Sequence, residues 1–146
     1  MKETIPAAPF LALAFLEGFV KAFGVKLSIL FVDDDPSMLE IVSVYFGDQG
    51  YEVATAVSGA EAMRVAEKRR LDLAILDIHL ANENGMDLLS RFKSIFPALP
   101  VILFTGYPEN DELLDEALTR GASGFMRKQN SLIKLGEVMR TYLPNS

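Results

Sequence analysis

The 146-residue sequence has no cysteine and no tryptophan, and it contains a single histidine. Without cysteine the chain has no disulfides, no thiol chemistry and no zinc site built on sulfur. One histidine gives little support to a His-rich metal centre or to a His-based catalytic triad. The sequence has no run of lysine and arginine, and its net charge of −6 argues against a nucleic-acid-binding surface. These features are compatible with residence in the cytoplasm.

The first residues are apolar but do not form a long hydrophobic run. Residues 10–16 are too few for a transmembrane span, which needs about 20 apolar residues. A secretory signal fits in outline, but Glu3 and Glu17 stand against it. We expect residues 1–26 to be an extension with a short apolar helix, in which Glu17 and Lys21 pair on the polar side. It would dock on the domain, on a second copy of the chain or on a membrane surface, and the sequence leaves these alternatives open.

The chain is organised around residues 27–35, an apolar run that stops at three consecutive aspartates. A continuous apolar run is typical of a strand that is buried on both faces of a parallel sheet. Pro36 suits the first turn of a helix, with Asp35 as its N-cap. The acidic residues therefore lie where a strand is followed by a helix. In open α/β sheets this carboxyl edge is where ligands bind.

The remaining sequence repeats the alternation of strand and amphipathic helix. Four further strands are expected, at residues 51–56, 71–76, 101–104 and 124–127. Residues 78–85 are expected to form a loop. The pattern predicts an α/β domain over residues 27–146, a flavodoxin-like (βα)5 doubly wound parallel sheet. The second and fifth strands have the patterns of edge strands, which gives the strand order 2-1-3-4-5.

Polar residues end four of these strands. Asp33 and Asp34 end the first strand, Asp77 ends the third, Thr105 the fourth and Lys128 the fifth. Since neighbouring parallel strands lie about 4.8 Å apart, these side chains should meet at one edge of the sheet. Adjacent carboxylates repel each other unless a cation offsets their charge, and Mg²⁺ is the usual ion where phosphate is also involved. The sequence thus predicts a site for a divalent metal ion and a phosphoryl group.

These residues stand in four motifs, in order along the chain: the pair Asp33-Asp34, residues 76–80 with Gly85, residues 104–106 and residues 125–128. With these motifs, residues 27 to about 143 resemble the response-regulator receiver domain of two-component signalling. The resemblance implies that the chain takes a phosphoryl group from a sensor histidine kinase or a phosphotransfer protein. It also implies a downstream protein target. The chain would catalyse its own phosphorylation and slow dephosphorylation without being a turnover enzyme in the usual sense.

The resemblance implies a role for each residue at the edge of the sheet. Asp77 would be the phosphoacceptor. Asp34 would bind Mg²⁺ directly and Asp33 largely through water, with Asp77 and the backbone carbonyl of His79 as further ligands. Lys128 would pair with Asp77 at rest and with the phosphoryl oxygens afterwards.

Two further residues would form a switch. Thr105 would hydrogen-bond the phosphoryl group, and its movement would let Phe125 turn inward. This change would reshape the surface that a partner protein reads.

The sequence departs from the family pattern at several positions. Gln129 follows Lys128 where proline is usual in a cis peptide, so we expect a trans peptide that shifts Lys128. Ala81 stands where proline is common. His79 and Tyr107 occupy the two positions that influence water attack on the acyl phosphate. Because both are bulky, we expect slow self-dephosphorylation.

Two other readings stay open at the level of the sequence. Asp33-x-Asp35, Thr105 and Lys128 imitate the first three motifs of phosphatases of the haloacid dehalogenase type, but Asp77 would then have no role. A receiver-like fold that only binds proteins, without phosphorylation, gains some weight from Gln129 after Lys128, but the five intact site residues argue against it. A homodimer contact through residues 1–26 is compatible with either reading.

Overall fold

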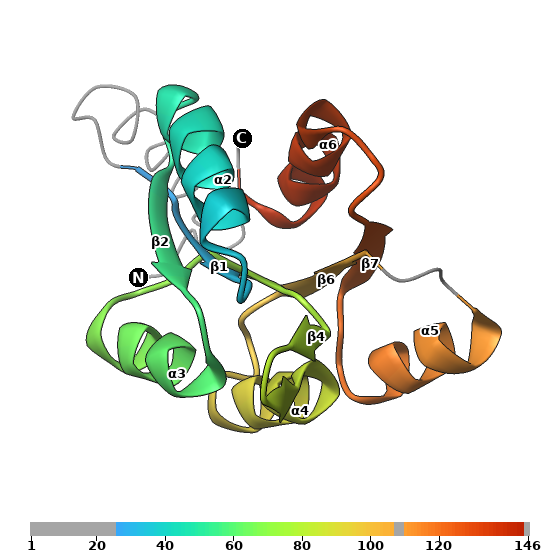
Figure 1. Ribbon diagram of the computed structural model, residues 1–146. Helices are drawn as coiled ribbons and strands as arrows, with labels where there is room; N and C mark the ends of the chain where they lie inside the picture. The colour runs from blue at the N-terminus through green and yellow to red at the C-terminus, as the bar shows by residue number, and fades with distance from the viewer. Residues whose placement is uncertain (1–25, 107–109, 145–146) are drawn as a thin grey trace, which may run out of the picture.

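The structure, a computed structural model, describes residues 26–106 and 110–144 (Figure 1). The elements in chain order are β1 (Ser28–Val32), α2 (Pro36–Asp48), β2 (Glu52–Ala56), α3 (Gly59–Lys68), β3 (Leu73–Leu76), β4 (His79–Leu80), β5 (Glu83–Asn84), α4 (Gly85–Ile95), β6 (Val101–Thr105), α5 (Asp111–Thr119), β7 (Gly124–Arg127) and α6 (Leu132–Tyr142). The helix expected in the N-terminal extension lies outside the described residues. In the part of the chain that the structure describes, no helix combines the length and apolar character required to cross a membrane.

Five parallel strands form one sheet in the order β2-β1-β3-β6-β7. Counted along this sheet, the order is 2-1-3-4-5, and the predicted flavodoxin-like fold is confirmed. All five residues of the central strand β1 are buried, whereas the edge strand β2 is partly exposed. Helices cover both faces of β1, so its residues from Ile29 to Val32 are apolar. This is why the continuous apolar run in the sequence indicated a central strand.

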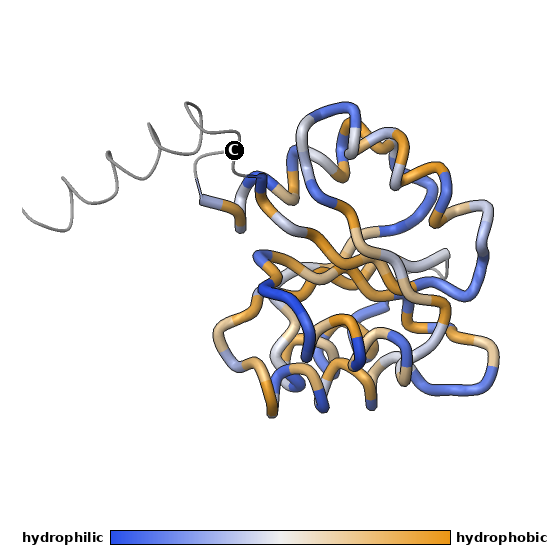
Figure 2. The backbone as a smooth tube through the Cα atoms, turned by 90° about the vertical axis from the view of Figure 1, so that its left-hand side faces the viewer, coloured by the Kyte–Doolittle hydropathy of each residue, from blue (hydrophilic) through white to orange (hydrophobic). Residues whose placement is uncertain are grey.

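Alternate residues of each central strand pack into two separate cores. In β1, Ile29 and Phe31 face the core shared with α2 and α6. Leu30 and Val32 face the core shared with α3, α4 and α5. Figure 1 shows these two helix layers on opposite sides of the sheet, and Figure 2 shows hydrophobic segments running between them. The period of two along a strand produces this division.

The segment of residues 78–85 differs from the loop that the sequence predicted. It contains a two-stranded antiparallel hairpin, in which His79 pairs with Asn84 and Leu80 with Glu83. The prediction was wrong because strands of two residues are too short to show an alternating pattern. The hairpin leads directly into α4, where the Asn84 side chain accepts a hydrogen bond from the Met86 N–H at 2.8 Å.

The junction between β1 and α2 has the predicted N-cap. The Asp35 carboxylate accepts a hydrogen bond from the Ser37 N–H at 2.9 Å, and Pro36 opens the helix. The N-cap turns the Asp35 carboxylate toward the start of α2. The two aspartates that precede it remain at the carboxyl end of β1.

Candidate functional site

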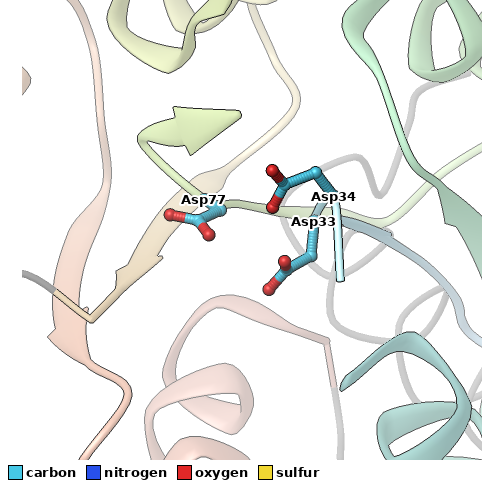
Figure 3. Close-up of side chains that lie close together, drawn as sticks. All are labelled: Asp33, Asp34 and Asp77. Atoms are coloured by element: carbon cyan, nitrogen blue, oxygen red, sulfur yellow. The ribbon is translucent and has the colours of Figure 1, made fainter. Parts of the chain in front are cut away.

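The strand register brings together three carboxylates from two strands. Val32 of β1 pairs with Leu76 of β3, so the next residues, Asp33 and Asp77, leave the sheet side by side. The Asp77 N–H also donates to the Val32 carbonyl at 2.9 Å. Carboxylate oxygens of Asp33, Asp34 and Asp77 lie within 4.8 Å of one another (Figure 3). The predicted acidic cluster therefore exists in the folded chain.

Lys128 extends to this cluster from the end of the edge strand β7. Its backbone N–H donates to the Thr105 carbonyl at 2.7 Å, which aligns the end of β7 with the end of β6. Its Nζ lies 2.8 Å from an oxygen of Asp77, as predicted, and 2.6 Å from an oxygen of Asp33, which was not predicted. The described residues include no cis peptide, so the Lys128–Gln129 bond is trans as expected. The trans bond does not keep the ammonium away from the carboxylates.

Burial makes the charges of this cluster costly. Asp33 and Asp77 are 5% and 6% exposed, while Asp34 is exposed. Burial raises the pKa of Asp33, although hydrogen bonds from Lys128 and the Asp35 N–H act in the opposite direction. Burial alone would lower the pKa of Lys128, but its hydrogen bonds to Asp33 and Asp77 outweigh burial and raise that pKa. Three carboxylates against one ammonium leave an excess of negative charge.

The oxygen donors of the cluster fit a magnesium ion. Mg²⁺ binds oxygen at about 2.0–2.1 Å, so ligands on opposite sides of the ion are about 4 Å apart. Among three ligands at most one pair is opposite and the other pairs are about 3 Å apart, so oxygens within 4.8 Å of one another would move closer together around one ion or bind it partly through water. The Asp77 carboxylate is already oriented, because its Oδ1 accepts a hydrogen bond from the His79 N–H at 3.0 Å. The backbone carbonyl of His79 belongs to the same turn of the chain.

Known proteins share this sequence pattern and this fold. The family model of the response regulator receiver domain matches residues 29–140. The chain belongs to this family. Its acidic cluster is therefore the phosphoacceptor pocket of a receiver domain of two-component response regulators.

Three relatives illustrate the match. The probable transcriptional regulatory protein TcrX of Mycobacterium tuberculosis is 32% identical over 112 residues, which are 77% of this chain and 47% of TcrX. The structure of chemotaxis protein CheY4 of Vibrio cholerae has 30% identity and a TM-score of 0.76, covering 82% of this chain and 100% of that one. The response regulator protein TrrA of Thermotoga maritima, in complex with Mg²⁺-BeF, has 27% identity and a TM-score of 0.72, with coverage of 80% and 99%. The chain spans less than half the length of the curated relatives that it matches. Its match covers 47% of TcrX and 22% of another of these relatives.

The two residues of the predicted switch lie on neighbouring strands, β6 and β7, of this receiver domain. Thr105 is fully buried at the end of β6, opposite Arg127 of β7. Phe125 is half-buried and packs against the core on the side of α3, α4 and α5. Of the two residues expected to govern dephosphorylation, His79 is exposed beside the pocket and Tyr107 lies outside the described residues.

Gly85 allows the start of α4 to approach the loop that follows Asp77. A Cβ atom at this position would lie 2.5 Å from the Asp77 carbonyl oxygen and 2.6 Å from the Ile78 carbonyl oxygen. The Gly85 N–H also donates to the Ile78 carbonyl at 2.8 Å. The glycine of the receiver motif is therefore required by a close backbone approach.

One contact beside the pocket was missed at the level of the sequence. The Glu83 side chain accepts a hydrogen bond from the Gly59 N–H at 2.6 Å, which joins the hairpin to the start of α3. The two residues are 24 positions apart. Neither residue carries a local signal that could have indicated the contact, because it depends on the unpredicted hairpin.

Proposed function

We propose that Asp77 accepts a phosphoryl group from the phosphohistidine of a sensor histidine kinase or a phosphotransfer protein. A carboxylate oxygen of Asp77 attacks phosphorus, so that a P–O bond forms while the P–N bond to the imidazole breaks. The imidazole keeps the electron pair of the broken bond and takes up a proton. The observation that carries this proposal is the buried Asp77 carboxylate, held beside Asp33 and in contact with the Lys128 ammonium.

We assign Mg²⁺ to the oxygens of Asp33, Asp34, Asp77 and the backbone carbonyl of His79. When bound, the ion screens the carboxylates from an anionic donor and stabilises charge on the transferred oxygens. The exposed Asp34 carboxylate suits direct ligation, and the buried Asp33, which Lys128 also contacts, suits ligation largely through water. The excess negative charge of the cluster supports this assignment.

Three further residues take part in phosphoryl transfer or in the conformational change that follows it: Lys128, Thr105 and Phe125. Lys128 pairs with Asp77 before transfer and with the phosphoryl oxygens afterwards, and its two carboxylate contacts orient it in advance. Thr105 then hydrogen-bonds the phosphoryl group. Its movement lets Phe125 turn inward and reshape the surface of α5, β7 and α6, which a downstream protein reads.

Two alternatives receive less support from the geometry. A phosphatase of the haloacid dehalogenase type would need Asp35 beside Asp33 as a reacting group. The Asp35 carboxylate instead caps α2 through the Ser37 N–H, while Asp77 is a member of the cluster with Asp33 and Asp34. A module that only binds proteins would not need an ammonium held between two buried carboxylates.

Incubation of the full chain with a small acyl phosphate and Mg²⁺ separates these functions. The proposal expects stoichiometric labelling that is abolished when a chelator removes Mg²⁺. Continuous release of phosphate from a generic phosphomonoester would favour the phosphatase. A chain that binds Mg²⁺ but takes up no label would favour the interaction module.

We also propose slow self-dephosphorylation, because bulky residues, His79 and Tyr107, stand at the two sequence positions that influence water attack on the acyl phosphate in this family. The double variant His79→Asn, Tyr107→Glu should shorten the half-life of the labelled protein. The loss of label over time, measured after the donor is removed, gives this half-life. An unchanged or longer half-life in the double variant contradicts the proposal.

The receiver domain is proposed to cover residues 27–146 and to act in the cytoplasm, with which a chain without disulfides is compatible. Curated relatives such as TcrX are transcriptional regulatory proteins of greater length. The proposed reader of the switch is accordingly a downstream protein or output domain. Contact with a membrane surface or a second copy through residues 1–26 remains part of this proposal.

A further inference from the structure

We propose that Glu83 is a positioning residue for the metal-binding side of the acidic pocket. This inference rests on the proposed function of the pocket. Glu83 lies in β5, opposite Leu80 of β4, on the hairpin that follows the phosphoacceptor. Its Oε2 accepts a hydrogen bond of 2.6 Å from the N–H of Gly59, the first residue of α3. We call this contact the Glu83–Gly59 clasp.

The clasp is a charge-assisted hydrogen bond at a helix N-terminus. The N-cap Ser58 already accepts from the Glu61 N–H at 3.2 Å, and the Glu61 carboxylate accepts from the Val57 N–H at 2.9 Å. Glu83 therefore satisfies a different backbone donor, which the helix's own capping residues leave to it. The positive end of the helix dipole favours a carboxylate at this place.

Position 59 requires a glycine because the Glu83 carboxylate occupies the space that a side chain would fill. A Cβ atom on Gly59 would overlap Oε1 of Glu83 and would lie 3.2 Å from Cδ1 of Leu88. Its backbone does not adopt the left-handed conformation that favours glycine. The absence of a side chain at this position thus serves the approach of the Glu83 carboxylate.

The clasp links the loop that follows Asp77 to the segment after β2, whose last residue contacts Asp33. Ala56, at the end of β2, accepts a hydrogen bond from the Asp33 N–H at 3.1 Å, and α3 begins shortly afterwards. On the other side, Glu83 shares its hairpin with His79, whose N–H donates to Asp77. The contact therefore ties the segment beside Asp33 to the loop that follows Asp77.

The position of the clasp complements that of Lys128. In the strand order, Lys128 follows the edge strand β7, while the clasp follows the opposite edge strand β2. Lys128 holds the acidic cluster from one side, and the Glu83–Gly59 clasp fixes the loop on the other. Groups that orient metal ligands in this way change metal affinity by about 10–100-fold when they are removed.

Titration calorimetry of Mg²⁺ into the full chain tests the role of Glu83. Glu83→Ala should weaken Mg²⁺ binding about tenfold, because the loop with His79 loses its tie to α3. Glu83→Gln keeps an acceptor oxygen but loses the charge, and it should recover part of the affinity. Glu67→Ala, at an exposed acidic position of α3, is the matched control and should bind like wild type.

Gly59→Ala gives a second test that separates positioning from stability. Alanine is the better helix former and needs no change of backbone, which offsets part of the loss of the clasp, so the variant should stay close to wild type in urea. Its Cβ atom should nevertheless displace Glu83 and weaken Mg²⁺ binding as Glu83→Ala does. The double variant should bind no more weakly than either single one, because both remove the same contact.

The outcomes distinguish this inference from the proposed function. If wild type binds Mg²⁺ and both single variants bind it equally well, the positioning role is wrong. The role is also wrong if Gly59→Ala leaves affinity unchanged while Glu83→Ala reduces affinity and stability together. A wild-type chain that does not bind Mg²⁺ overturns the proposed metal site, and the positioning role with it.

Discussion

The two edges of the central sheet are made from opposite ends of the same strands, yet their chemistry differs. At the carboxyl edge, the buried carboxylates of Asp33 and Asp77 contact the Lys128 ammonium, and Thr105 is buried at the end of the strand that precedes β7. At the amino edge lies a pocket of about 650 Å³, whose lining is mainly apolar and includes Phe96, Pro97, Ala98, Leu99, Pro100 and Tyr142. Arg69 and Arg70 stand in the lining of this pocket, and the Arg70 side chain is 90% exposed.

The difference shows where the fold accepts an unfavourable arrangement of charge. At the amino edge, Arg70 stays in solvent and its pairing with Asp72, at 3.7 Å, is loose. At the carboxyl edge, the chain buries two carboxylates and raises the pKa of Asp33 by doing so. Stability alone does not favour such an arrangement. A site that binds a cation and a phosphoryl group explains it.

Removal of the ammonium should have the largest effect on the carboxyl edge. We expect Lys128→Ala to lower the rate of labelling by a small acyl phosphate about a hundredfold, because the charge that develops on the phosphoryl oxygens loses its fixed partner. Lys134→Ala removes an exposed lysine and should label like wild type. Labelling of Lys128→Ala at the wild-type rate in saturating Mg²⁺ would mean that the ammonium has no part in transfer.

Glycine-to-alanine substitutions compare the crowded pocket with an open position. Gly85→Ala places its Cβ against the backbone of Asp77 and Ile78, and we expect it to lower the free energy of unfolding by about 1–3 kcal/mol. Gly47→Ala, in α2, meets no atom within 4 Å and should raise that free energy by up to about 1 kcal/mol. Urea unfolding measures both. Equal effects at the two positions would contradict the close approach of α4 to the loop that follows Asp77.

The raised pKa of Asp33 predicts a pH dependence of stability. Between its ordinary value of 3.8 and the raised value, the folded chain binds more protons than the unfolded chain, so this group makes stability fall as pH rises through that window. In the absence of Mg²⁺, Asp33→Asn should remove this loss and be more stable than wild type above the window. Mg²⁺ should then stabilise wild type more than the variant. Urea unfolding across pH, with and without Mg²⁺, checks both statements.

The amino edge should give the smallest response. Arg70→Ala removes a side chain that is 90% exposed and lies 3.7 Å from Asp72, and we expect a stability change below about 0.5 kcal/mol. The rate and extent of labelling should stay at the wild-type level. A clear loss of labelling in this variant would show that the two edges are coupled and would break the comparison between them.

Much of the fold and of the pocket could be predicted because a buried parallel strand appears in the sequence as a continuous apolar run. The apolar run of β1 ends at Asp33, and that of β3 ends at Asp77. Once both are strands, the register must place the two aspartates together. Thr105 and Lys128 follow from the same reasoning on β6 and β7. Strand ends are thus predictable from one-dimensional patterns.

Contacts that depend on side-chain reach could not be predicted in this way. The pairing of Lys128 with Asp33 depends on the path of a long side chain across two strands. The Glu83–Gly59 clasp depends on a hairpin whose strands have two residues each. No periodic pattern exists at that length, and the clasp links residues that are distant in sequence.

The central claim is that the acidic edge of the sheet delivers a phosphoryl group to Asp77, and the position of the label tests it most directly. The full chain is labelled with a small acyl phosphate and Mg²⁺, and the acyl phosphate is reduced with borohydride and located by mass spectrometry. The account predicts a label on Asp77 and none in a folded Asp77→Asn variant. A label on another residue, or undiminished labelling of Asp77→Asn, would contradict it.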